Sequence, residues 1–183
     1  RCTQASFKER MSSLLVFILA FSTGEQLVYE GKFGFLKLGK MVLEISDSVI
    51  CDSQQCYSIT SRINSNPDLH FLFTLNDTIK VQTTVDSLLP VRYEKRVREG
   101  KYVNYTRLHF CRDSQFVYYN DSLKFPILTN SRDLLSFWYY LRRIPLVEGD
   151  TIRLVIHEAK ENHDIKCPVL KKEKIRTRLG ELE

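Results

Sequence analysis

Short runs in which apolar and polar residues alternate are the feature that most constrains the fold of this 183-residue chain. In one such run Tyr57, Ile59, Ser61 and Ile63 fall on one side of an extended backbone, as a half-buried strand requires. Turn residues separate the runs at intervals of roughly ten positions. The pattern predicts a mainly β protein: a single antiparallel meander that forms a strongly curved sheet or a partly open barrel.

The expected strands follow from where this alternation starts and stops. In the first half of the chain we expect strands over 27–35, 41–45, 57–63, 69–75 and 79–85, with a bend at Gly39 and turns at 64–68 and 76–77. The most apolar alternating face belongs to Leu69, Phe71, Phe73 and Leu75. Later strands are expected over 91–98, 102–110, 151–157 and 165–178, with turns at 99–101 and 162–164.

The segment Ser131–Leu146 interrupts this alternation and predicts one aromatic-rich helix over residues 131–144. Ser131 or Asp133 can cap its N-terminus, and Pro145 ends it. Arg142 and Arg143 lie in the last turn, where positive charge favours the helix dipole.

The helix carries apolar side chains on most of its circumference. Leu134, Trp138 and Leu141 share one face and Phe137 widens it, so we expect this face to be buried. Since a helix this apolar must be covered, we expect it to pack on the concave face or at one end of the sheet.

Length and composition indicate one ordinary globular domain. Hydrophobic residues make up 43% and charged residues 27% of the chain, and 183 residues can bury a sizeable core. The net charge of +5 is mildly basic and does not by itself indicate a nucleic-acid partner.

The N-terminus predicts export. Lys8 and Arg10 precede an apolar run at 14–21 that is too short to span a membrane but suits a secretory signal peptide. Small residues at Ala20 and Ser22 favour cleavage after Ser22, which gives a signal peptide over 1–22 and one β-rich domain over 23–183. Met11 is a candidate start, which would make residues 1–10 upstream read-through. The alternative is a buried N-terminal helix or strand.

Cysteine usage agrees with export, because four cysteines remain after the expected cleavage. Cys51 and Cys56 flank a polar tetrad between two strand-like runs, so they are candidates for a disulfide across a hairpin. Cys111 and Cys167 are candidates for a second bridge, although the sequence does not decide the pairing. The alternative is four reduced cysteines in a core.

No motif that carries chemistry was found. The chain has no nucleophile elbow, phosphate-binding loop, dinucleotide-binding motif or metalloprotease motif. The spacing of its cysteines and of His70, His109, His157 and His163 matches no zinc pattern, so we expect neither a metal nor another cofactor. Basic runs at 95–98 and 171–178 are most simply solvated strand faces, and the alternative is contact with anionic lipid headgroups. Nucleic acid is not expected for an exported protein.

Three blocks of sequence, in order, carry a resemblance to a known family. They are Gly24–Glu30 with Gly34, Phe35 and Gly39; Val85–Lys95 with Arg98–Tyr102; and Asp133–Ser136 with Tyr139–Arg142, Pro145, Leu146, Gly149 and Asp150. The chain thereby resembles the bacterial envelope family known as domain of unknown function 3108. The resemblance implies an exported β-rich protein, periplasmic or outer-membrane-associated in a Gram-negative bacterium. It supplies no reaction and no catalytic residues.

The chain departs from the family pattern at its C-terminus. In the family, the stretch similar to Arg178–Glu181 leads into further strands, whereas this chain stops at Glu183. The resemblance therefore implies a C-terminally truncated member in which one sheet edge lacks its neighbour.

Three classes of function are compatible with these features. The first is a noncatalytic envelope protein that binds a lipid or another apolar ligand, with candidate contacts at Trp138, Tyr139, Tyr140, Arg142, Phe71 and Phe73. The alternative for these residues is that they fill the core. The second class is a structural or assembly module that acts through a sheet edge or the basic strands, and the third is an enzyme with an unrecognised site. Whether the space beneath the helix is hollow or filled separates them best.

Overall fold

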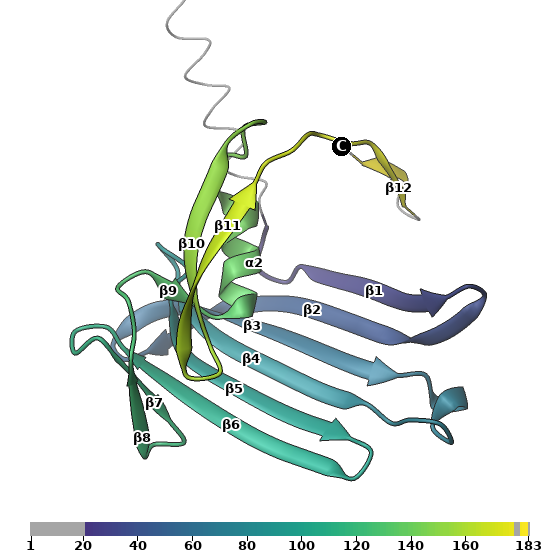
Figure 1. Ribbon diagram of the computed structural model, residues 1–183, viewed down its shortest axis with the longest axis horizontal. Coiled ribbons are helices and arrows are strands. Elements are labelled where there is room, and N and C mark those ends of the chain that lie inside the picture. The colour runs from purple at the N-terminus through teal and green to yellow at the C-terminus, as the bar shows by residue number, and fades with distance from the viewer. Residues whose placement is uncertain (1–20, 178–179, 183) are drawn as a thin grey trace, which may run out of the picture.

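A computed structural model describes residues 21–177 and 180–182, and Figure 1 shows their arrangement. Residues 1–20 of the predicted signal peptide lie outside the described residues. Phe21 is described, and its ring packs edge-on against the rings of Tyr57 and Tyr139 at centroid distances of 5.7 and 5.2 Å. Cleavage after Ser22 would therefore remove one ring that contacts the core.

Eight strands form the main sheet, each antiparallel to the strand before it. They are β1 (Gln26–Phe33), β2 (Leu36–Cys51), β3 (Gln54–Ser65), β4 (Asn76–Thr84), β5 (Pro90–Glu99), β6 (Tyr102–Cys111), β7 (Phe116–Tyr119) and β8 (Leu123–Pro126). The strands lie in the sheet in the order of the chain, so the predicted antiparallel meander is confirmed. The sheet is open, because β1 and β8 are its two edges and do not pair with each other.

The remaining strands are separate from this meander. β9 (Ser131–Arg132), β10 (Thr151–Glu158) and β11 (Glu161–Pro168) form a second sheet, in which β9 runs parallel to β10. β12 (Ile175–Thr177) and β13 (Gly180–Leu182) form a two-stranded hairpin. The single meander expected from the sequence therefore accounts for the first eight strands only.

Two hairpin turns lie where the sequence placed them. Cys51 and Gln54 pair across Asp52 and Ser53, which both have positive φ values of 46° and 66°. Glu99 and Tyr102 pair across Gly100, whose φ of 59° lies in the left-handed region that glycine adopts without strain.

The predicted strand over 69–75 is wrong. The chain instead forms the short 3-10 helix η2 (Pro67–Leu69) and a loop, and β4 already begins at Asn76, where a turn was expected. The side chain of Asn66 accepts a hydrogen bond from the N–H of Asp68, which caps η2 and turns the chain out of the sheet. The alternation of Leu69, Phe71 and Phe73 therefore does not correspond to a strand.

Three other boundaries also differ from expectation. The turn between the first two strands lies at Gly34–Phe35, and Gly39 is inside β2, where a Cβ atom would come within 2.3 Å of the Asn64 carbonyl oxygen. The turn expected at 162–164 lies at Ala159–Lys160, both with positive φ, so 162–164 belong to β11. The basic strand expected over 165–178 is interrupted, because β11 ends at Pro168.

The helix α2 (Leu134–Arg143) is shorter than expected at its start. Asp133 is its N-cap: one carboxylate oxygen accepts the N–H groups of Leu135 and Ser136 at 2.8 and 3.2 Å. The hydroxyl of Ser136 in turn accepts the N–H of Asp133 and completes a capping box. Ser131 is not in the helix, because it pairs with Val155 of β10.

The buried face of α2 is not the face that the sequence suggested. Leu135, Ser136, Phe137 and Tyr139 are buried, whereas Trp138 is 54% exposed and Leu134 is 48% exposed. The predicted burial of Leu134 and Trp138 is therefore wrong. A helix with apolar residues around most of its circumference allows several stripes, and the stripe of Leu135 and Tyr139, four positions apart, is the one that meets the sheet.

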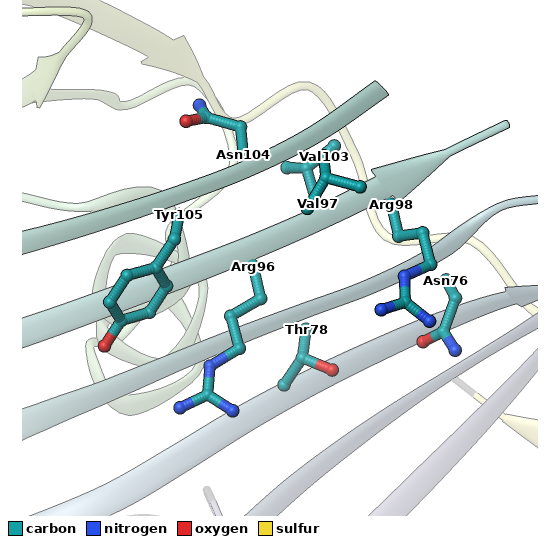
Figure 2. Close-up of a pocket in the computed structure, with 8 residues that line it drawn as sticks. All are labelled: Asn76, Thr78, Arg96, Val97, Arg98, Val103, Asn104 and Tyr105. Atoms are coloured by element: carbon teal, nitrogen blue, oxygen red, sulfur yellow. The ribbon is translucent and has the colours of Figure 1, made fainter. Parts of the chain in front are cut away.

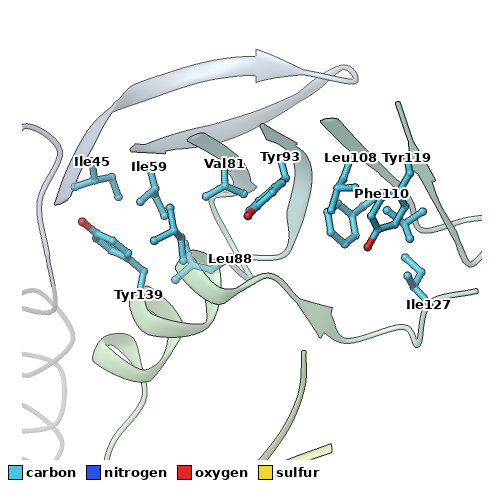
Figure 3. Packing of buried hydrophobic residues seen from close by; sticks show 12 residues of the cluster. Ile45, Ile59, Val81, Leu88, Tyr93, Leu108, Phe110, Tyr119, Ile127 and Tyr139 are labelled. Carbon is cyan, nitrogen blue, oxygen red and sulfur yellow. The ribbon is translucent and has the colours of Figure 1, made fainter. Parts of the chain in front are cut away.

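The main core lies between α2 and one face of the eight-stranded sheet, which arches over the helix in Figure 3. The helix therefore packs on a face of the curved sheet, as expected. Eight core residues lie on strands, two in connections and two on the helix: Ile45, Ile59, Val81, Tyr93, Leu108, Phe110, Val117 and Tyr119; Leu88 and Ile127; Leu135 and Tyr139.

Two arginines hold the segment that leads into the helix, and we call them the arginine clamps. Arg112 donates from Nη2 to the carbonyl oxygens of Pro90 and Ser131 at 3.0 and 2.9 Å. Arg132 donates to the carbonyl oxygens of Ser87 and Leu88. Burial lowers the pKa of Arg112 to about 10, so this guanidinium remains charged at neutral pH, and burial also lowers the pKa of Arg132.

Candidate functional site

The space beneath the helix is filled by side chains. Tyr139 is 1% exposed and lies with Ile45, Ile59 and Leu88 in the core of Figure 3. A hollow of about 200 Å³ remains beside Leu134 and Leu135, and it is smaller than the sites that hold drug-sized ligands. A long acyl chain must therefore bind elsewhere.

The six candidate ligand contacts are divided between two distant regions. Tyr139 belongs to the core, while Trp138 is exposed and contacts Phe137 at a ring-centroid distance of 5.8 Å. Phe71 and Phe73 lie in the loop after η2, at the end of the sheet that is farthest from the helix in Figure 1. The structure does not bring the aromatic helix and this loop together into one site.

The other two helix candidates are engaged by neighbouring side chains. The guanidinium of Arg142 forms two hydrogen bonds with the carboxylate of Glu25, at 2.7 and 2.8 Å, and joins the segment before β1 to the end of α2. This bidentate contact raises the pKa of Arg142. The guanidinium of Arg132 stacks 3.8 Å from the centre of the Tyr140 ring. Arg142 and Tyr140 thus have packing roles in this structure.

A buried polar network centred on His157 is the arrangement most similar to a catalytic site. His157 Nδ1 donates to the side-chain oxygen of Asn162 at 3.2 Å, and Nε2 accepts from the hydroxyl of Tyr119 at 3.0 Å. That hydroxyl accepts the N–H of Lys160, and Ser131 donates its hydroxyl to the same Asn162 oxygen.

This network leaves His157 no free nitrogen for a substrate. Its ring is buried, and burial lowers its pKa, which favours the neutral form. The two hydrogen bonds place the single ring proton of that form on Nδ1. The network joins β7, β9 and the β10–β11 hairpin, and its arrangement fits a structural fastening.

An apolar groove of about 420 Å³ lies on the core face of the sheet, beyond the part that the helix covers. Its floor is formed by Tyr29, Met41 and Ile63, which lie opposite one another on β1, β2 and β3. Phe73 and Leu75 from the loop after η2 line it as well. The groove is open to solvent and mainly apolar, a lining that suits an acyl chain.

The lengths of β2 and α2 explain why the groove exists. β2 has sixteen residues and therefore extends over roughly 50 Å, whereas the ten-residue helix is about 15 Å long. The helix cannot cover the whole apolar face of such a sheet. The alternation at Tyr29, Met41 and Ile63 indicated apolar side chains, but not that they lie beyond the helix.

A second hollow lies on the opposite, polar face of the sheet, and we call it the basic patch: Asn76, Thr78, Arg96, Arg98 and Tyr105 on β4, β5 and β6. Figure 2 shows these side chains on the same side of the sheet, while Asn104 points to the other side. Arg96 lies between Thr78 and Tyr105 in register, and its guanidinium carbon is 5.2 Å from the centre of the Tyr105 ring. The hollow measures about 530 Å³, and its two guanidinium groups suit an anionic group.

A larger hollow, of about 870 Å³, lies beside α2 and the second sheet. Its lining combines carboxylates and cations, namely Asp86, Asp164, Arg153 and Lys166. This mixture of charges suits neither an acyl chain nor a single anion, so we assign it no ligand.

Cys51 and Cys56 form a disulfide with Cα atoms 6.1 Å apart, which agrees with the pairing proposed across the hairpin. Cys111 and Cys167 are free thiols on β6 and β11, so the second bridge is wrong for this structure.

The described residues, 21–177 and 180–182, contain no group of three or more His, Cys, Asp or Glu side chains that could hold a metal ion. Within the same residues, no helix has the length and apolarity needed to cross a membrane.

Comparison with known proteins identifies the family. The family described as "Protein of unknown function (DUF3108)" matches residues 28–183, nearly the whole chain. The chain belongs to this family. Neither a curated protein nor a solved structure matches it. The three sequence blocks that carried the resemblance lie in β1 and β2, in the β4–β6 region, and in α2 with the turn before β10.

Proposed function

We propose that this family member is an exported, noncatalytic protein of the Gram-negative cell envelope, periplasmic or outer-membrane-associated, that binds the acyl chain of a lipid. The observation that carries the proposal is the apolar groove over Tyr29, Met41 and Ile63. Apolar side chains that remain uncovered on a large sheet are unfavourable in water, and an acyl chain would cover them.

Export is supported by the sequence and by the disulfide. A disulfide such as Cys51–Cys56 persists in an oxidising compartment, whereas the cytosol keeps thiols reduced. The charged and apolar N-terminal pattern agrees with the same compartment. Fractionation of a Gram-negative host that produces the full chain tests this part of the proposal: recovery in the cytoplasm, with residues 1–22 retained, contradicts it.

Ligand binding is tested on the protein exported by that host and purified without detergent. Organic extraction and mass spectrometry should recover acyl lipid in an amount comparable with the protein. Met41→Glu places a charge in the groove and should abolish this recovery, because an ionised carboxylate cannot share a site with an acyl chain.

Val42→Glu is the matched control. Val42 is the next residue on β2 and faces the opposite side of the sheet, where it lies opposite Arg62. This variant should retain the lipid. Wild-type protein that is repeatedly empty, and that does not bind a fluorescent long-chain fatty acid, contradicts the proposal.

A second function, assembly through a sheet edge, is favoured by the state of β1. Among the described residues this strand pairs on one side only, and Val28, Tyr29 and Phe33 on it are all exposed. Such an edge can accept a strand from another chain. Photo-crosslinking from position 28 in cells should then capture a defined partner, and capture of none would contradict assembly through this edge.

A further inference from the structure

Three connections between strands lie at the same end of the main sheet, on the side away from the helix in Figure 1. They are the β1–β2 turn, the loop that follows η2, and the β5–β6 turn. We call them together the hairpin rim, which comprises residues 33–37, 67–74 and 98–103.

The hairpin rim is one connected surface, because hydrogen bonds join its three parts. Asn66, next to η2, donates its side-chain N–H to the carbonyl oxygen of Lys37 and its backbone N–H to that of Leu38, at 3.0 and 2.7 Å. On the other side, Gly100 donates to the carbonyl oxygen of Thr74 at 2.8 Å. The loop after η2 is therefore fixed to both hairpins.

This surface exposes large apolar side chains that do not contribute to the core. Phe35 is 100% exposed at the tip of its turn, and Phe33 and Phe71 are 78% and 80% exposed. Leu72, Tyr102 and Val103 are exposed beside them. A turn needs glycine or small polar residues, so a fully exposed phenylalanine contributes nothing to the turn and increases the apolar surface in water. Clusters of this kind mark an interaction surface.

The rim carries charges of both signs, with cations in small excess. Lys37, Arg98 and Lys101 lie in the rim with the carboxylates of Asp68 and Glu99, and Lys32 beside it is paired with Glu30 at 3.3 Å. The basic patch is continuous with it, since Arg98 and Val103 line that hollow and lie opposite each other at the β5–β6 end. Apolar tips next to the two guanidinium groups of the basic patch complement a bilayer that carries anionic headgroups.

We propose that the hairpin rim docks on an anionic lipid bilayer, with Phe33, Phe35 and Phe71 in the interface and the basic patch on a headgroup phosphate. The proposal does not depend on the acyl-chain groove, which lies on the other face of the sheet from the basic patch. The small excess of cations in the rim and the two guanidinium groups of the basic patch favour a bilayer with anionic headgroups over a second copy of the chain.

The first experiment uses the fact that the chain has a single tryptophan, Trp138, on the exposed side of the helix. The full-length double variant Phe35→Trp with Trp138→Phe reports from the rim, and the wild-type chain reports from the helix. Vesicles of phosphatidylglycerol that carry bromines on the acyl chains should shift the emission of the rim tryptophan to the blue and quench it. Emission from Trp138 should change little. The site of the reporter separates rim docking from attachment through the N-terminal apolar run.

The second experiment measures co-sedimentation of the full chain with phosphatidylglycerol and with phosphatidylcholine vesicles. Phe35→Asp with Phe71→Asp should weaken binding by at least about tenfold, because each phenylalanine transferred to an apolar environment contributes roughly this factor. Arg98→Glu with Lys101→Glu should weaken binding to phosphatidylglycerol and leave phosphatidylcholine unaffected. Trp138→Asp, which removes an exposed aromatic residue outside the rim, is the control and should leave binding unchanged.

Three results would overturn the proposal: equal spectral changes at positions 35 and 138, no change at either, or a rim double variant that binds as the wild type does. Sedimentation velocity without vesicles tests whether the rim instead binds a second copy of the chain. A dimer that disappears in Phe35→Asp with Phe71→Asp would assign the rim to self-association and also overturn docking on a bilayer. Since Met41→Glu changes the groove and not the rim, it should leave vesicle binding intact, so failure of the ligand proposal is distinguishable from failure of this one.

Discussion

The contrast between two neighbouring helix residues, Tyr139 and Trp138, provides a direct test of how α2 is oriented. Tyr139 is almost completely buried against Ile45 and Ile59, and the core there is closed. Replacing a buried aromatic residue of this size by alanine removes its transfer free energy and leaves a cavity, so Tyr139→Ala should lower the free energy of unfolding by about 3–5 kcal/mol.

Trp138→Ala should be much less destabilising, at about 1–2 kcal/mol. About half of the ring is already in water, the other half contacts Phe137, and the vacated space opens to solvent without a closed cavity. Alanine also has the higher helix propensity, which offsets part of the loss.

The measurement is urea unfolding followed by circular dichroism, which does not depend on the single tryptophan. Tyr139→Phe, which retains the ring, is the matched control and should change stability by less than about 1 kcal/mol. If Trp138→Ala is as destabilising as Tyr139→Ala, the helix presents a different face to the sheet and the assignment of its buried stripe is wrong.

Three further predictions concern stability. The bidentate Glu25–Arg142 contact, in which both side chains are at least two-thirds buried, should give a coupling energy of about 1 kcal/mol in a double-mutant cycle with alanine at both positions; additive effects would contradict a direct interaction. Burial lowers the pKa of His157 in the folded protein below 6.5, so the unfolded chain takes up a proton first. Its contribution to stability is complete above pH 6.5 and is lost as the pH falls toward the folded-state pKa, and His157→Gln should flatten this dependence in urea titrations between pH 7 and 5. Removal of the disulfide by Cys51→Ser with Cys56→Ser should lower the free energy of unfolding by about 2 kcal/mol, because the closed loop is short; an unchanged urea midpoint would show that the bridge does not constrain the unfolded chain.

Strand alternation and turn chemistry were sufficient to predict the meander. The pairing of Glu99 with Tyr102 across Gly100, and of Cys51 with Gln54 across two polar residues, follows from local turn geometry that any reader of the sequence can recognise. The same reasoning failed over 69–75, since Asn66 and Pro67 initiate a 3-10 turn that overrides the alternation.

The buried face of the helix and the location of the candidate site could not be predicted in the same way. Apolar residues surround α2, so the choice between Trp138 and Tyr139 depended on which stripe meets Ile45 and Ile59, a tertiary property. The groove depends on how far β2 extends past the helix, and the basic patch on the register that aligns Arg96 with Tyr105. Pairing of residues from separate strands decides both, and a single sequence does not specify it.

The arginine clamps have a consequence for the order in which the chain acquires its structure. The carbonyl groups that Arg132 binds belong to residues 44 and 45 positions earlier, in the connection between β4 and β5, so they are in place only after the meander has turned there. Contacts of such long sequence separation form late and slow the folding of a domain. Helix α2 and the second sheet should therefore join a preformed meander as one unit, and they should leave it as one unit during unfolding. In native-state hydrogen exchange, the amides of α2 and of β10 would then share one opening free energy, lower than that of the central strands β3 to β5.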